Sequence, residues 1–139
     1  MASSEKYTRT FEKFEKAFAK YREIVKSREL FDFLAEDLII EVNTKRFEYV
    51  FESMWHTLKE QLRIEGIDAP SPLKSFKEAF KLGLISEAHE RIFVEMIDKR
   101  NQIVHVYDFN QAKIIYEFIK SAEVFSAIEN VYNKLKKIA

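Results

Sequence analysis

Arg100 and His105 are the residues of this chain best suited to chemistry, and they lie in the segment Arg-Asn-Gln-Ile-Val-His-Val-Tyr-Asp, residues 100–108. Arginine carries a permanent cation whose shape matches a phosphate group, and histidine accepts a proton near neutral pH. Together the two side chains suit the cleavage of a phosphodiester without a metal. On an unbroken helix, however, positions i and i+5 point about 140° apart. We therefore expect either that the helix ends between them or that a second copy of the chain completes the site.

The composition sets limits on the remaining function classes. The chain has 139 residues, of which 47% are hydrophobic and 14% are aromatic, which is enough for one domain over residues 1–139 with a substantial core. The 23 basic residues balance the 23 acidic residues, so any contact with RNA must come from a local patch and not from the net charge. Cysteine is absent and the three histidines do not have metal-ligand spacing, so we expect no disulfide, no metal and no cofactor.

The sequence carries no sign of a membrane or export segment. No apolar run approaches the roughly 18 residues that a bilayer span requires, and the first six residues, Met-Ala-Ser-Ser-Glu-Lys, contain no hydrophobic signal core. We therefore expect a cytoplasmic protein that does not contact the membrane.

Helix-breaking residues are confined to one short stretch. The two glycines and two prolines all lie between Gly66 and Gly83, so the rest of the chain is predicted to be helical. The first helix has an apolar stripe with alternating spacings of four and three residues: Tyr7, Phe11, Phe14, Phe18, Tyr21 and Val25. A second helix is expected to begin near Asp32 and to run to about Glu65, with Gly66 as its stop.

Three further helices complete the predicted fold. A short one should begin at Pro72 and end at Gly83, and another should follow a cap at Ser86. The last is expected from Gln111 to about Lys137, after a turn and cap at Asp108 and Asn110. Its apolar stripe consists of Ile115, Ile119, Ala122, Phe125, Ile128, Tyr132 and Leu135. The pattern predicts an all-α fold, an antiparallel up-and-down four-helix bundle with one short extra helix.

Four ordered blocks carry a family resemblance. They are Lys45–Glu52 with Trp55 and Leu58-Lys59, then Ser71-Pro72, then Ala79–Ile85, and last Arg100-Asn101 with His105-Val106-Tyr107-Asp108. These blocks resemble the nucleotidyltransferase substrate-binding protein family, which belongs to the HEPN superfamily of HepT-like toxins. The resemblance covers roughly residues 45–117 and departs from the family pattern at His56, where a lysine is usual, and at Phe93, near a usual tryptophan.

This resemblance implies a HEPN-like helical homodimer in which two Arg–His motifs face a shared cleft. It also implies a partner, a minimal nucleotidyltransferase of the DNA-polymerase-beta type. HepT-like members are metal-independent ribonucleases that act as toxins on RNA. The partner is the antitoxin and uses ATP and Mg²⁺ to place AMP on the tyrosine of the motif, here Tyr107.

Each site residue has a functional and a structural interpretation. His105 is a candidate general base for a ribose 2′-hydroxyl and Arg100 a candidate phosphate ligand, whereas a capping histidine and a surface arginine are the alternative. Asn101 either bonds the backbone or orients the histidine, or else caps the helix C-terminus. Tyr107 is either an exposed modification acceptor or a core residue.

Two charged residues are candidate supporting residues of the site. Arg46 is a candidate contact of Asp108 or of substrate, although a solvated charge is the common state of such a residue. Trp55 and His56 are interpreted as packing and surface residues.

Two other functions remain open: a non-catalytic substrate- or nucleotide-binding subunit of a nucleotidyltransferase complex, and a plain interaction bundle with a vestigial motif.

Overall fold

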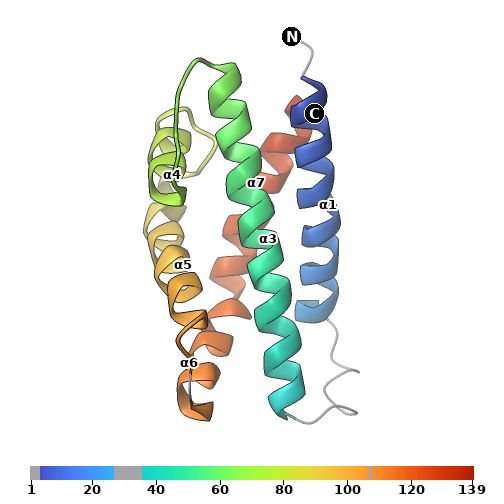
Figure 1. Ribbon diagram of the computed structural model, residues 1–139, viewed down its shortest axis with the longest axis vertical. Coiled ribbons are helices and arrows are strands. Elements are labelled where there is room, and N and C mark those ends of the chain that lie inside the picture. The colour runs from blue at the N-terminus through green and yellow to red at the C-terminus, as the bar shows by residue number, and fades with distance from the viewer. Residues whose placement is uncertain (1–3, 27–35, 107) are drawn as a thin grey trace.

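The computed structural model describes residues 4–26, 36–106 and 108–139, and every regular element in these ranges is a helix. Figure 1 shows α1 and α5 running away from the end that carries both termini, and α3 and α7 running back toward it. The all-α prediction is confirmed. The elements are α1 (Glu5–Lys26), α3 (Glu36–Ile64), α4 (Pro72–Lys81), the 3-10 helix η1 (Glu87–His89), α5 (Glu90–Ile103), α6 (Phe109–Ile119) and α7 (Ala122–Ile138).

The two glycines end α3 and α4 as predicted. Gly66 and Gly83 have φ angles of 84° and 76°, a left-handed conformation that glycine adopts without a steric penalty. The amide of Ile67 then donates to the carbonyl of Leu62 at 2.8 Å, which closes the end of α3. Ser71 caps α4 by accepting from the amide of Lys74, and Pro72 is the first residue of that helix.

The aromatic stripe of α1 faces the centre of the bundle. Tyr7, Phe11, Phe14, Phe18 and Tyr21 are all buried, while Val25 is only partly buried and Ile24 is buried beside it. Phe18 stacks on Tyr132 of α7 with ring centroids 4.7 Å apart. The aromatic side chains of α1 therefore fill the core of one chain. None of them is exposed on this helix for contact with a second copy of the chain.

The prediction of one continuous last helix is wrong. The chain leaves helical geometry after Ile119 and begins α7 at Ala122, because Ser121 caps the new helix by accepting from the amide of Val124. The hydroxyl of Tyr21 donates to the carbonyl of Ile119 at 2.8 Å. Ala122, the first residue of α7, is exposed and Tyr132 is partly buried, whereas the other residues of the predicted stripe are buried: Ile115, Ile119, Phe125, Ile128 and Leu135.

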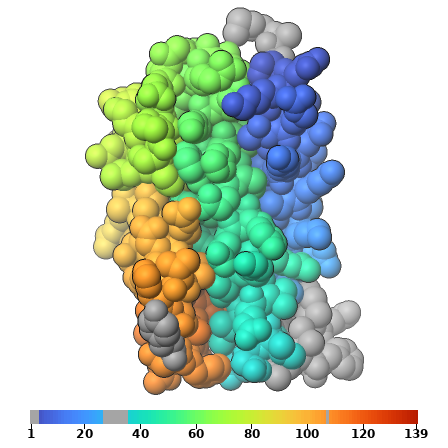
Figure 2. Space-filling view, in the orientation of Figure 1, coloured from blue at the N-terminus to red at the C-terminus, as the bar shows by residue number. Residues whose placement is uncertain are grey.

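The expected start of the second helix near Asp32 lies outside the described residues. In the described part of the chain, α3 begins at Glu36. From there α3 runs the length of the bundle and contacts α1, α4, α5 and α6. On the face shown in Figure 2, α3 lies between α1 on one side and α5 with α6 on the other. Helix α3 therefore borders any site formed on either side of it.

Candidate functional site

The helix that carries Arg100 ends before His105, as one of the two expectations required. Helix α5 stops at Ile103, Val104 has φ −72° and ψ −9°, and the amide of His105 donates to the carbonyl of Gln102 at 2.9 Å in a tight turn. Asp108 then caps α6 by accepting from the amide of Gln111 at 2.8 Å, which confirms the predicted cap. The junction between α5 and α6 therefore frees His105 from the helical geometry that would point it away from Arg100.

Arg100, Asn101 and His105 line one surface cavity. Its volume is about 470 Å³, and its other lining residues are Val104 on the same junction and the carboxylates Glu48 and Glu52 on α3. His105 is exposed, while the side chain of Arg100 is 33% exposed. The cavity thus brings a cation and an imidazole to one surface that a ligand can reach.

The guanidinium of Arg100 is held by three neighbours. It forms an ion pair with the carboxylate of Glu52, donates to the side-chain oxygen of Asn101 at 3.3 Å, and lies over the ring of Phe51 at 5.4 Å from the centroid. Asn101 lies within α5 and not at its end, so the interpretation as a C-cap is wrong. Its side chain contacts Arg100 instead.

Glu52 is the site residue that the sequence did not reveal. Besides Arg100 it accepts a hydrogen bond from the indole of Trp55 at 3.1 Å, and its carboxylate lies 3.7 Å from Nε2 of His56. The spacing of Glu52, Trp55 and His56 on one helix was visible in the sequence. The pairing with Arg100, 48 positions away, depends on how α3 packs against α5.

His56 lies beside this carboxylate on the α1 side of α3. Its ring stacks on Trp55 with centroids 4.2 Å apart, and its side chain is 50% exposed. Partial burial lowers the pKa of His56, the Glu52 carboxylate raises it, and the cations Lys59, Arg100 and Lys13 lower it further. Trp55 is 8% exposed, so the packing role of Trp55 and the surface position of His56 are both confirmed.

The other predicted site residues lie elsewhere. The guanidinium of Arg46 donates to the carbonyl of Lys20 at 2.8 Å, which ties α3 to the last part of α1. Asp108 serves as the cap of α6. Among the described residues no hydrogen bond or ion pair joins Arg46 to Asp108. Tyr107 lies outside the described residues.

Comparison with known proteins supplies the family. Residues 5–137 match the family model of nucleotidyltransferase substrate binding protein like sequences. The chain belongs to this family. No curated protein matches the chain significantly.

Two solved structures resemble this member of the nucleotidyltransferase substrate-binding-like family. A crystal structure of a protein from Thermus thermophilus has a TM-score of 0.76 at 27% sequence identity and covers 88% of this chain and 98% of its own. A tri-AMPylated HEPN toxin from Shewanella oneidensis, solved in complex with the MNT antitoxin, has a TM-score of 0.72 at 12% identity and covers 96% of this chain and 98% of its own. Because the identity to the HEPN toxin is only 12%, this likeness shows a shared fold.

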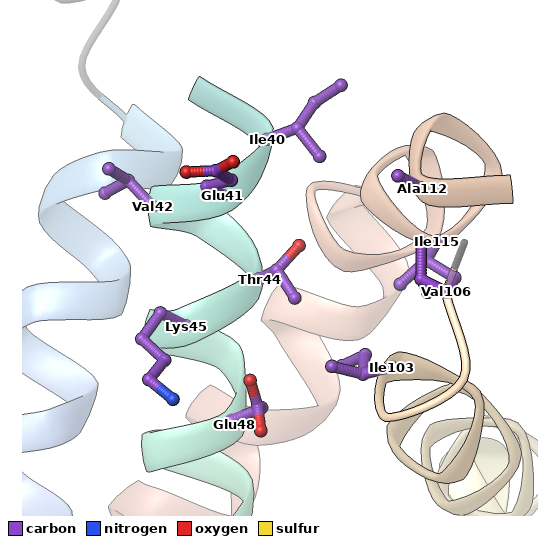
Figure 3. A pocket seen from close by; sticks show the side chains of 10 residues that line it. All are labelled: Ile40, Glu41, Val42, Thr44, Lys45, Glu48, Ile103, Val106, Ala112 and Ile115. Carbon is purple, nitrogen blue, oxygen red and sulfur yellow. The ribbon is translucent and has the colours of Figure 1, made fainter. Parts of the chain in front are cut away.

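A further, mainly apolar cavity of this family member lies next to the cavity that Arg100, Asn101 and His105 line, which we call the Arg100 cavity. It has a volume of about 480 Å³ and is open between the first half of α3 and the α5–α6 junction. Figure 3 shows the side chains of Ile103, Val106 and Ile115 facing α3 across this space. Glu48 lines both cavities, so the apolar cavity and the Arg100 cavity are neighbours along α3.

The described ranges contain neither a metal-binding cluster nor a membrane-spanning helix. Within residues 4–26, 36–106 and 108–139, no three histidine, aspartate or glutamate side chains are grouped so that they could hold a metal ion. In the same ranges no helix is both long enough and apolar enough to span a bilayer.

Proposed function

We propose that this chain is a HepT-like HEPN protein, a single domain that cleaves RNA without a metal in the cytosol and is neutralised by a minimal nucleotidyltransferase. The observation that carries the proposal is the cavity of about 470 Å³ that Arg100, Asn101 and His105 line together. The family match supports the link to a nucleotidyltransferase. The fold it shares with a HEPN toxin that was solved with its MNT antitoxin supports the pairing.

The chemistry follows from the two side chains. The neutral imidazole of His105 takes the proton of a ribose 2′-hydroxyl, and the 2′-oxygen attacks the adjacent phosphorus. Arg100 donates hydrogen bonds to the phosphate oxygens and stabilises the charge of the pentacoordinate state. The bond from phosphorus to the 5′-oxygen then breaks, and the 5′-oxygen takes a proton from water. The hydroxide that remains takes the proton that His105 accepted, which restores the neutral imidazole. The products are a 2′,3′-cyclic phosphate and a 5′-hydroxyl.

Arg100 is already paired, and this shapes the mechanism. Its guanidinium has five N–H donors, of which Glu52 and Asn101 engage one nitrogen each. These two residues fix the side chain in the cavity, and a phosphate uses the donors that remain. Asn101 and Glu52 are therefore positioning residues that act through Arg100.

A ribonuclease assay tests the proposal. The purified chain should cleave single-stranded RNA in the presence of EDTA, leave 2′,3′-cyclic phosphate ends, and leave DNA intact because DNA lacks the attacking hydroxyl. Arg100→Ala and His105→Ala should abolish cleavage. Arg91→Ala is the matched control, because Arg91 lies on the same helix with a side chain 92% exposed. Equal cleavage by the wild type and both site variants would show a contaminating nuclease and contradict the proposal.

Tyr107 is the residue that the partner modifies under this proposal. It lies two positions after His105, so AMP attached to its hydroxyl would place a phosphate near the cavity and draw Arg100 into pairing with it. Incubation with a minimal nucleotidyltransferase partner, ATP and Mg²⁺ should add AMP to the wild type, as read by mass spectrometry, and not to Tyr107→Phe. Tyr116→Phe is the control, because Tyr116 is 6% exposed. An adduct on Tyr107→Phe would contradict this assignment.

A homodimer is part of the same proposal. Large apolar side chains are exposed at the junction and on α6: Val104 is 68% exposed, Phe109 47% and Ile114 62%. Figure 1 shows α6 at the end of the molecule opposite the termini. Val104 also lines the Arg100 cavity, and α6 contributes Ala112 and Ile115 to the apolar cavity. A two-fold contact through this end would cover apolar surface and bring two Arg–His motifs near each other.

A non-catalytic role is the second candidate. The ion pair between Arg100 and Glu52 leaves a carboxylate in the cavity where a phosphate would bind, and the family description names a substrate-binding protein. Under this alternative the chain presents a nucleotide or substrate to the partner enzyme. Binding of nucleotide without any cleavage of RNA, together with faster turnover by the partner, would favour it.

A further inference from the structure

A second polar cavity lies on the other side of α3, between this helix and α1. Its volume is about 530 Å³, and four of its lining residues are cations: Lys6 and Lys13 on α1, and Lys59 and Arg63 on α3. The half-exposed imidazole of His56 also lines it. The α1–α3 groove, as we name this cavity, is not used by the mechanism above.

The negative charge of the buried carboxylate in the groove, Glu60, is already compensated by two cations. Glu60 is 4% exposed and accepts hydrogen bonds from Arg63 at 2.9 and 3.0 Å through Nε, and Lys6 lies 3.6 Å away. The hydrogen bond from Arg63 is the main reason that the pKa of Glu60 is lowered, so this carboxylate stays ionised and paired. Arg63 and Lys6 are therefore engaged by Glu60.

Lys13 and Lys59 are the cations of the groove that remain available. In the described part of the chain neither forms an ion pair with a carboxylate. The ammonium of Lys59 lies 5.7 Å from the centre of the Trp55 ring. Both lysines act on His56 from opposite helices, since the charge of each lowers the pKa of that imidazole. Two cations and an imidazole thus converge near Trp55 with no acidic partner for the lysines among the described residues.

The α1–α3 groove and the Arg100 cavity are neighbours along α3. Glu52 lines both spaces, and its carboxylate contacts Arg100 on one side and approaches His56 on the other. From Glu52 to Arg63 the helix advances eleven residues, which is about 16 Å at 1.5 Å per residue. A stacked single strand rises about 3.4 Å per nucleotide, so the groove has room for a few nucleotides beyond the Arg100 cavity.

We propose that Lys13, Lys59 and His56 form a second phosphate subsite, which holds the RNA strand next to the phosphodiester bound at Arg100. This inference rests on the proposed function, because it names the part of the substrate that lies outside the reacting bond. A strand is favoured over a free nucleotide because the α1–α3 groove and the Arg100 cavity lie next to each other, with Glu52 lining both. Binding then depends on backbone phosphates and tolerates different base sequences.

Binding of an uncleavable strand tests the subsite separately from catalysis. A fluorescein-labelled eight-nucleotide DNA lacks the 2′-hydroxyl and is expected to bind the wild type, as measured by fluorescence anisotropy. The double variant Lys13→Ala/Lys59→Ala should bind about tenfold more weakly. The slope of log K against log salt concentration should also become less steep by about 1.4, because each phosphate contact on a single strand contributes about 0.7. The control Lys16→Ala/Lys20→Ala removes two lysines of α1 that do not line the groove and should bind like the wild type.

Trp55 provides a second readout, because it is the single tryptophan of the chain and stacks on His56. Its fluorescence should respond to the DNA strand at lower concentrations than to inorganic tripolyphosphate. Equal affinity for tripolyphosphate and the strand would show a site for free polyphosphate and overturn the inference. Equal binding of the strand by all three proteins, or no binding by the wild type, would also overturn it. None of these results affects the ribonuclease assay. If that assay fails while the strand binds as expected, the α1–α3 groove remains a strand-binding site and the proposed cleavage is contradicted.

Discussion

The carboxylate of Glu52 pairs with the guanidinium of Arg100 across the contact between α3 and α5. The same carboxylate accepts from Trp55 and approaches His56, so it connects the Arg100 cavity with the α1–α3 groove. A residue at this position has two opposite effects on an anionic ligand. It holds Arg100 in place, and it adds a negative charge beside the bound phosphate.

Glu52→Gln separates these two effects. Glutamine keeps an acceptor for Arg100 and Trp55 but removes the charge, so the eight-nucleotide DNA should bind several times more tightly. The side chains of the pair are 33% and 38% exposed, so the free energy of unfolding should fall by no more than about 1 kcal/mol. Anisotropy and urea unfolding measure the two quantities.

Glu95→Gln is the control for this change, because Glu95 pairs with Arg91 on an exposed face of α5. It should alter neither binding nor stability measurably. Weaker binding of DNA by Glu52→Gln would show that the position of Arg100 matters more than the charge of Glu52.

Tyr21→Phe tests the break between α6 and α7. The variant leaves the buried carbonyl of Ile119 without the hydroxyl that donates to it at 2.8 Å, so the free energy of unfolding should fall by about 1–3 kcal/mol. Tyr49→Phe is the control, because Tyr49 is 56% exposed and its loss of a hydroxyl should have little effect. A change for Tyr21→Phe as small as the control in urea unfolding would mean that the break is held by the Ser121 cap alone.

His56 predicts a pH dependence of stability. Its pKa in the folded chain lies below the ordinary value of 6.5, chiefly because of burial. The unfolded chain therefore binds a proton at a higher pH than the folded chain does, and stability falls as the pH decreases through 6.5. In His56→Gln this loss should be smaller over the same range.

The measurement is the urea midpoint of both proteins between pH 7.5 and about pH 5, a window around the pKa of histidine. An NMR titration of the His56 ring gives the pKa directly. A pKa above 6.5 would mean that the charge of Glu52 outweighs burial and the cations Lys59, Arg100 and Lys13, and it would reverse the sign.

The sequence predicted the stripe of α1 because local spacing decides it. Residues four and three apart lie on one face of a helix whatever the helix packs against, and Tyr7 to Tyr21 are accordingly buried. The split of the last helix has one local signal, the cap residue Ser121, but neither glycine nor proline marks it. It depends on Ser121 together with the hydroxyl of Tyr21, which is 98 positions from its acceptor.

The same distinction applies to the site. The end of α5 between Arg100 and His105 was one of two options that the i, i+5 spacing allowed, and the structure selects it. In the sequence Glu52 stood out only as the last residue of the block Lys45–Glu52. Its contact with Arg100 depends on which face of α3 meets α5, and single-sequence periodicity does not determine that contact.

Dimerisation through the α6 end of the molecule is the last prediction. Light scattering on a sizing column should report twice 16.6 kDa for the wild type. Ile114→Lys should give a monomer, because a charge would be buried in the contact. In one chain Ile114 is 62% exposed, so the variant should fold with a change in stability within about 0.5 kcal/mol.

Val94→Lys is the matched control, because Val94 is 53% exposed on α5 and lies beside α4, away from the junction. It should remain a dimer. If the wild type is a monomer at micromolar concentration, the homodimer proposal fails, and Arg100 and His105 of one chain must act alone. If Val94→Lys dissociates and Ile114→Lys does not, the contact lies on the α4–α5 face instead, and the two Arg–His motifs do not share a cleft.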